Sequence, residues 1–139
     1  MPLTKPVIIA GAGPVGCVAA LRLAQAGIPV RLLEGARELP ETLRASTFHP
    51  PSLDMIEQLG LDKPLIAQGL ICDKYQYRDR RTGDIAEFDL GVLKDDTRHP
   101  YRLQAEQWKL VHLVWKELQE KYSHLAEVHT NYAVKGVHQ

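Results

Sequence analysis

Apolar positions in the first 34 residues follow two different periods. Residues 7–10 (VIIA) form a short β-rich run, which is typical of a strand buried on both faces of a parallel sheet. From Pro14 to Ala26 the apolar positions recur at helical spacing, and Gly27 is a suitable residue to end the helix. Residues 30–33 (VRLL) have the pattern of a second strand, which ends at Glu34. This order predicts a βαβ unit.

The periodic pattern breaks after Glu34, so residues 35–49 are predicted to form a loop. Two prolines open a predicted helix that ends at Gly60, and a shorter helix is expected over residues 62–69. Residues 75–79 and 84–90 flank the sequence RRTG, a connection that predicts an antiparallel β-hairpin.

The last third of the chain predicts one long helix over residues 105–122 and one strand over residues 128–137. The helix prediction rests on apolar residues spaced three or four apart, namely Trp108, Val111, Trp115, Leu118 and Tyr122. No repeat, linker or domain boundary is visible, so residues 1–139 are treated as one region. The fold class expected is α/β, an incomplete parallel sheet with inserted helices and a β-hairpin.

A glycine motif lies between the first strand and the first helix. It matches GxGxxG, and its residues are Gly11, Ala12, Gly13, Pro14, Val15 and Gly16. The first glycine permits a tight turn, the second lets a phosphate approach the backbone, and the third lets the helix pack closely against the strand. The helix N-terminus would then offer unpaired N–H groups to a pyrophosphate.

Glu34 is a candidate ribose ligand because it ends the second strand, eighteen residues after Gly16. Its carboxylate could accept both ribose hydroxyls of an adenosine group. The alternative is a glycine-rich turn with a surface glutamate. The motif predicts dinucleotide binding, and with the βαβ unit it makes the expected α/β fold a Rossmann-like FAD/NAD(P)-binding fold. It does not distinguish NAD from FAD, because it contacts only the ADP half that they share.

Composition and residue spacing argue against nucleic-acid binding, membrane association and metal binding. Seventeen basic residues balance seventeen acidic ones, so no net charge attracts the chain to nucleic acid or to a membrane. Cys17 and Cys72 lack metal-ligand spacing, as do the six histidines, so no metal site is expected. No segment has the length of a membrane span, and a cytoplasmic location is expected. Cys17 is expected to pack in the core.

The chain resembles the amino-terminal part of the FAD-dependent aromatic hydroxylases, the single-component flavoprotein monooxygenases that include p-hydroxybenzoate hydroxylase. The resemblance covers nearly the whole chain. It rests on four segments: residues 7–16 (VIIAGAGPVG), 32–34 (LLE), 43–46 (LRAS) with the helix ending at 59–61 (LGL), and 101–104 (YRLQ).

The resemblance implies a role for three side chains in FAD binding. Glu34 would hold the adenosine ribose, Arg44 would reach the pyrophosphate, and Gln104 would contact the cofactor from the start of the long helix. Two alternatives stay open, since Arg44 could be a solvated loop cation and Gln104 a helix cap. Arg37 is a weaker candidate for a contact with adenine.

The intact enzyme implied by this resemblance uses NAD(P)H and O₂ to hydroxylate an aromatic, phenolic substrate. Two later family motifs and most of the substrate-binding sheet are absent, so the chain is expected to be an inactive fragment with no catalytic residue assigned. An unpaired sheet edge would favour self-association. The alternatives are an NAD-linked dehydrogenase or other dinucleotide-binding oxidoreductase, and a non-catalytic nucleotide-binding module.

Overall fold

The chain forms two compact units, a division that the sequence pattern did not indicate. A computed structural model describes residues 5–39, 41 and 45–138. The first unit combines residues 1–44 with 107–139, and the second contains residues 45–106. The inserted helices and hairpin of the sequence analysis therefore have a compact unit of their own.

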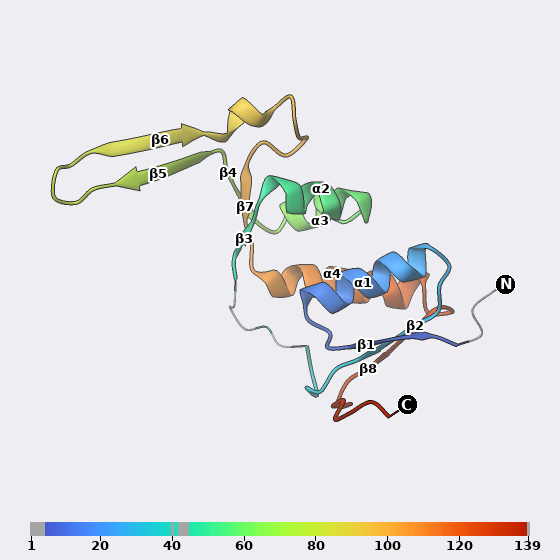
Figure 1. The fold of residues 1–139 in the computed structure, drawn as a ribbon. Helices are drawn as coiled ribbons and strands as arrows, with labels where there is room; N and C mark the ends of the chain where they lie inside the picture. Colours follow the sequence, from blue (N-terminus) through green and yellow to red (C-terminus); the bar gives the residue numbers. More distant parts are fainter. Residues whose placement is uncertain (1–4, 40, 42–44, 139) are drawn as a thin grey trace. The chain divides into compact units, whose positions relative to one another are not determined.

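The first unit is a parallel sheet with two helices. Its elements are β1 (Val7–Ala10), α1 (Pro14–Gln25), β2 (Val30–Leu33), α4 (Gln107–Lys121) and β8 (Ala126–His129). The strand order is β1-β2-β8, and both pairs are parallel. The two helices lie side by side on one face of this sheet (Figure 1). The predicted βαβ unit is thus confirmed, with β1 and β2 at the predicted residues.

The core of the first unit lies between the helices and the sheet. Small side chains on α1 allow the helix to approach both partners closely. The buried residues of the two helices are Cys17, Ala20, Leu21 and Ala24 on α1 and Leu110, Val111, Val114 and Leu118 on α4. From the predicted apolar face of this helix, Val111 and Leu118 are buried, whereas Trp108 and Trp115 are only half-buried. The packing face of α4 is therefore rotated away from the two tryptophans.

Two sequence predictions for this unit are wrong. β1 is not buried on both faces, because Val7 is 38% and Ile8 62% exposed. The reason is that β1 is an edge strand among the described residues, and the helices cover one face only. The last strand ends at His129 rather than continuing to residue 137, since Asn131 takes the left-handed conformation with φ of 61°.

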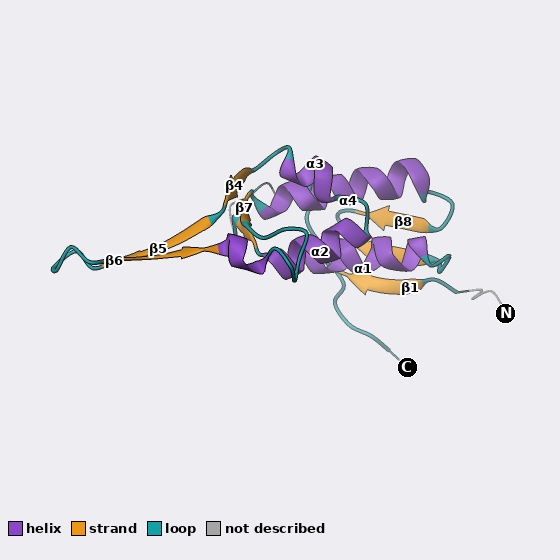
Figure 2. Cartoon of the chain, turned by 90° about the horizontal axis from the view of Figure 1, so that it is seen from above, coloured by secondary structure: helices purple, strands orange, loops and turns teal. Residues whose placement is uncertain are grey.

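The second unit contains two antiparallel sheets and two short helices. A three-stranded sheet has the order β3-β7-β4, and β5 pairs with β6 as the predicted hairpin. The hairpin extends away from the two helices of its unit (Figure 2). The elements in chain order are β3 (Thr47–Phe48), α2 (Pro50–Gln58), α3 (Asp62–Ile66), β4 (Leu70–Cys72), β5 (Lys74–Arg78), β6 (Ile85–Asp89), the 3₁₀ helix η1 (Leu90–Leu93) and β7 (Arg102–Gln104).

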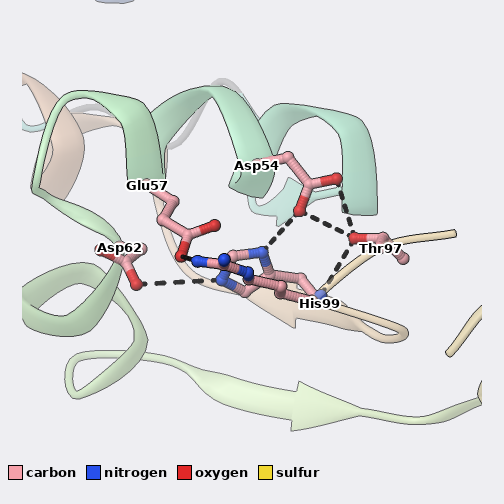
Figure 3. Close-up of polar contacts among 6 residues, drawn as sticks. Asp54, Glu57, Asp62, Thr97 and His99 are labelled. Carbon is pink, nitrogen blue, oxygen red and sulfur yellow. Dashed lines mark hydrogen bonds and ion pairs between the residues drawn. The ribbon is translucent and has the colours of Figure 1, made fainter. Parts of the chain in front are cut away.

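His99 joins the segment before β7 to both helices of the second unit (Figure 3). Among the described residues, His99 is the one polar side chain that is buried, with 4% of its surface exposed. Its Nδ1 lies 2.7 Å from Asp54 Oδ1 on α2, and its Nε2 lies 3.9 Å from Asp62 Oδ2 on α3. Thr97 Oγ1 adds contacts of 2.7 and 2.8 Å to the two Asp54 oxygens. The ionised Asp54 carboxylate can only accept, so His99 Nδ1 is the donor.

Acid is expected to destabilise the second unit through Asp54. Hydrogen bonds from His99 and then Thr97 lower the pKa of this carboxyl group. A lowered folded-state pKa gives stability that is present above the unfolded pKa, about 3.9, and is lost as the pH falls through the folded value. Denaturant unfolding measured from pH 6 to pH 2 should show this loss. Asp54→Asn should flatten that acid limb, and an unchanged limb would contradict the assignment.

Candidate functional site

The glycine loop lies between β1 and α1 and takes its shape from backbone geometry. Gly11 has φ of 99°, a left-handed conformation that favours glycine, and its N–H donates to the carbonyl of Leu33 at 2.7 Å. Gly13 is the N-cap residue of α1 in an extended conformation, and Pro14 opens the helix. The tight turn predicted at Gly11 is therefore confirmed.

Gly13 and Gly16 have opposite surroundings. A Cβ atom at Gly16 would lie 2.0 Å from the Gly11 carbonyl oxygen and 3.3 Å from Ile9 Cγ2. A Cβ atom at Gly13 would meet no atom of the described chain within 4 Å. The third glycine is thus required for close packing of helix and strand, while the second borders open space that a ligand can enter.

The N-terminus of α1 has the chemistry to bind an anion. The first N–H groups of a helix have no partner within the helix, and the helix dipole places partial positive charge there. Among the described residues no side chain caps this end, and no acidic residue lies in the first turn. Val15, in that turn, is 84% exposed. The twelve-residue α1 therefore presents an open, uncapped N-terminus beside Gly13.

Glu34 lies at the carboxyl end of β2, where the structure brings it to the glycine loop. Its Oε2 accepts a hydrogen bond from the Ala12 N–H at 2.7 Å, and its Oε1 accepts one from the Ala36 N–H at 2.9 Å. Its own N–H donates to the His129 carbonyl. A carboxylate thus lies beside the loop, at the place expected for a ribose ligand.

Cys17 contributes to the loop from the core side. It is fully buried, and its Sγ donates to the Ala12 carbonyl oxygen at 3.2 Å. Burial, followed by the charge of Glu34, raises the pKa of the Cys17 thiol to about 12. The thiol therefore stays protonated at neutral pH, and the prediction that Cys17 packs in the core is confirmed.

A cavity of about 440 Å³ lies within the same unit, next to the carboxyl ends of β2 and β8. This volume is in the range of small-molecule sites. Its lining residues are Arg37, Glu38, Leu39, Glu41, His112, Trp115 and Thr130. Among these residues, the sequence analysis had offered Arg37 for a contact with adenine and had placed Trp115 on the apolar face of the long helix. No sequence signal marked Thr130.

The two other predicted cofactor residues lie elsewhere. Arg44 lies outside the described residues. Gln104 belongs to the second unit, where it ends β7 and its Oε1 accepts a hydrogen bond from Thr47 Oγ1 at 3.0 Å. The expectation that Gln104 starts the long helix is wrong, because α4 begins at Gln107. The chain pairs residues 102–104 into a sheet instead.

One side-chain group of the second unit has the ligand types for a metal ion. Atoms of Asp54, Glu57 and His99 lie within 4.8 Å of one another. Each has a protein partner, since Asp54 contacts His99 and Glu57 pairs with Arg98 at 2.7 Å. The local charges are therefore balanced within the protein, and the cluster is explained by its structural contacts. No helix of the described chain is long and apolar enough to cross a membrane.

Comparison with known proteins identifies the family. The model of the FAD binding domain matches residues 4–139. Para-nitrophenol 4-monooxygenase of a Pseudomonas species is 32% identical over 133 residues, which cover 96% of this chain and 32% of that protein. The 6-hydroxy-3-succinoylpyridine 3-monooxygenase HspB of Pseudomonas putida is 35% identical over 118 residues, which cover 85% of this chain and 30% of that protein.

A solved structure supports the same relationship. The p-nitrophenol 4-monooxygenase PnpA of Pseudomonas putida superimposes on this chain with a TM-score of 0.89 and 29% sequence identity. The superposition covers all of this chain and 35% of the PnpA chain. The chain thus spans about a third of the length of these relatives. Its glycine loop, its Glu34 and these matches agree, and the chain belongs to the FAD binding domain family.

Proposed function

We propose that the glycine loop, the N-terminus of α1 and Glu34 hold the ADP half of FAD. The observation that carries this proposal is the position of the Glu34 carboxylate, 2.7 Å from the Ala12 N–H, beside a Gly13 that borders open space. The pyrophosphate would lie against the backbone at Gly13 and the helix N-terminus. The two ribose hydroxyls would donate to Glu34.

The cavity lined by Arg37 supports a place for the adenine ring. Its lining includes Arg37, three residues after Glu34 in the sequence, and a guanidinium can stack on an aromatic ring. By family resemblance, Arg44 would contact the pyrophosphate and Gln104 would also contact the cofactor. These two roles stay proposals that rest on the resemblance.

We infer that the whole protein is an FAD-dependent monooxygenase that hydroxylates an aromatic, phenolic substrate with NAD(P)H and O₂. FAD supplies the redox chemistry when bound, and the residues of this chain bind and orient it. The names of the relatives, which include a nitrophenol and a hydroxypyridine monooxygenase, support this substrate class. No residue between 1 and 139 is assigned a proton transfer, and this chain alone is proposed to be inactive.

Calorimetric titration with FAD, and with NAD in parallel, tests the proposed site. Saturable binding of FAD with much weaker binding of NAD is expected. Glu34→Ala should weaken FAD binding by roughly 1–3 kcal/mol, about 5- to 150-fold, because it removes a charged acceptor. Glu120→Ala, a change at an exposed glutamate on α4, should leave the affinity unchanged. Equal FAD affinity in the Glu34 and Glu120 variants would refute the ribose role, and stronger binding of NAD would favour a dehydrogenase.

We also propose that the chain self-associates through β1. Among the described residues β1 pairs with β2 alone, and its exposed Val7 and Ile8 add apolar surface. Light scattering should therefore show a mass above that of the monomer as concentration rises, and Ile8→Lys should reduce it. A constant monomer mass at high concentration would exclude this self-association.

We also propose a cytoplasmic location for the protein.

A further inference from the structure

We propose that Glu34 and Cys17 together form a clamp on Ala12 that fixes the direction of the Gly13 N–H before any nucleotide binds. Both backbone groups of Ala12 are held by side chains. Its N–H donates to Glu34 Oε2 at 2.7 Å, and its carbonyl accepts from Cys17 Sγ at 3.2 Å. The consequence for affinity rests on the proposed FAD site, whereas the clamp itself is a property of the chain without FAD.

Peptide geometry connects this clamp to the ligand side of the loop. The Ala12 carbonyl and the Gly13 N–H belong to one planar trans peptide, so they point in opposite directions. The thiol holds the carbonyl toward the core, because Cys17 is fully buried. The Gly13 N–H must therefore point away from Cys17. A Cβ atom at Gly13 would also meet no protein atom, so the loop has room for an anion there.

Burial of Ala12 makes its two hydrogen bonds to Glu34 and Cys17 hard to replace. Ala12 is 1% exposed, so water cannot readily replace a hydrogen bond that is lost there. Cys17 serves as a donor only while it is protonated, and its raised pKa ensures this at neutral pH. Glu34 also accepts from the Ala36 N–H, so one carboxylate links the loop after β1 to the loop after β2.

Glu34 thereby has a positioning role that is separate from its contact with ribose, and Cys17 is a positioning residue with no ligand contact. The thiol is a weak donor, so its contribution is expected to be modest. Loss of this donor should lower both FAD affinity and folding stability, because the buried Ala12 carbonyl would be left without its partner.

Amide hydrogen exchange in the FAD-free chain tests the clamp directly. The Ala12 amide is expected to exchange at least tenfold more slowly than the Gly13 amide, since the former is bonded and the latter is not held by the clamp. Glu34→Gln should accelerate exchange at Ala12 and Ala36, because a glutamine amide offers one acceptor and one donor in place of two acceptors. Equal exchange of Ala12 and Gly13 in the unaltered chain would overturn the clamp without any variant.

Titration of cysteine variants with FAD tests the consequence. Cys17→Val removes the donor and adds volume at a fully buried site, so it should weaken FAD binding by about fivefold and also lower the free energy of unfolding. Cys17→Ser restores a donor and should bind within about twofold of the unaltered chain. Cys72→Ser, at a cysteine of the second unit, is the matched control. Unaltered affinity in Cys17→Val would overturn the positioning role. If the unaltered chain binds no FAD, the proposed function fails, and exchange at Ala12 still decides the clamp.

Discussion

Gly13→Val is expected to abolish measurable FAD binding while the chain remains folded. The added side chain meets no atom of the described protein, so it would occupy the open space beside the helix N-terminus. The pyrophosphate must approach the backbone at this position. Gly13 has φ of −71° and ψ of 179°, an extended conformation that valine adopts readily. Affinity should fall at least about 100-fold, equivalent to about 2.7 kcal/mol.

Calorimetry with FAD and thermal unfolding of the same samples measure this effect. Gly136→Val is a suitable control, because Gly136 has near-open surroundings in the exposed tail of the same unit. It should change neither affinity nor stability. Normal FAD affinity in Gly13→Val would show that the cofactor does not contact this loop, and the proposed FAD site would be wrong.

Gly16→Ala is expected to cause the opposite result, a loss of folding stability rather than a blocked ligand. A single added methyl group would lie 2.0 Å from the backbone oxygen of Gly11. A backbone oxygen cannot move aside as a flexible side chain can, so α1 must shift away from β1. The cost should reach or exceed the upper part of the ~1–3 kcal/mol range typical of overpacking.

Urea unfolding followed by circular dichroism measures this stability. Gly13→Ala adds the same methyl group three residues earlier without a steric contact, so it is the matched control and should unfold like the unaltered chain. Equal midpoints for the two alanine variants would mean that α1 and β1 are not packed as closely as the structure describes.

Local features of the site could be predicted from the sequence because they depend on neighbouring residues. The change from a β-rich run to helical spacing located β1, α1 and β2 with little error. The tight turn at Gly11 and the close packing at Gly16 follow from the geometry of a strand-to-helix turn, and the structure confirms both. The short strand β7 was missed, because three residues carry too little periodicity to separate a strand from the start of a helix.

Other features depend on contacts between residues that are distant in the sequence. Among the described residues β1 pairs with β2 alone, and the helices cover one face of the sheet (Figure 1), so Ile8 is exposed although the sequence predicted its burial. Likewise, α4 packs through Leu110 and Val114 rather than through its tryptophans, because the neighbouring α1 determines which face is covered. Hydrophobic spacing predicts that a helix has an apolar face, but only the packing partner selects the residues that are buried.

The sequence by itself determined the βαβ unit, the glycine loop and the acidic residue after β2, because each is specified by local spacing and backbone sterics. Only the tertiary structure decided that Glu34 and Cys17 both hold Ala12, and that residues 45–106 form a separate unit. The physical reason is that side-chain hydrogen bonds and compact packing depend on distances in space. A linear pattern specifies these distances only within one element or between adjacent elements.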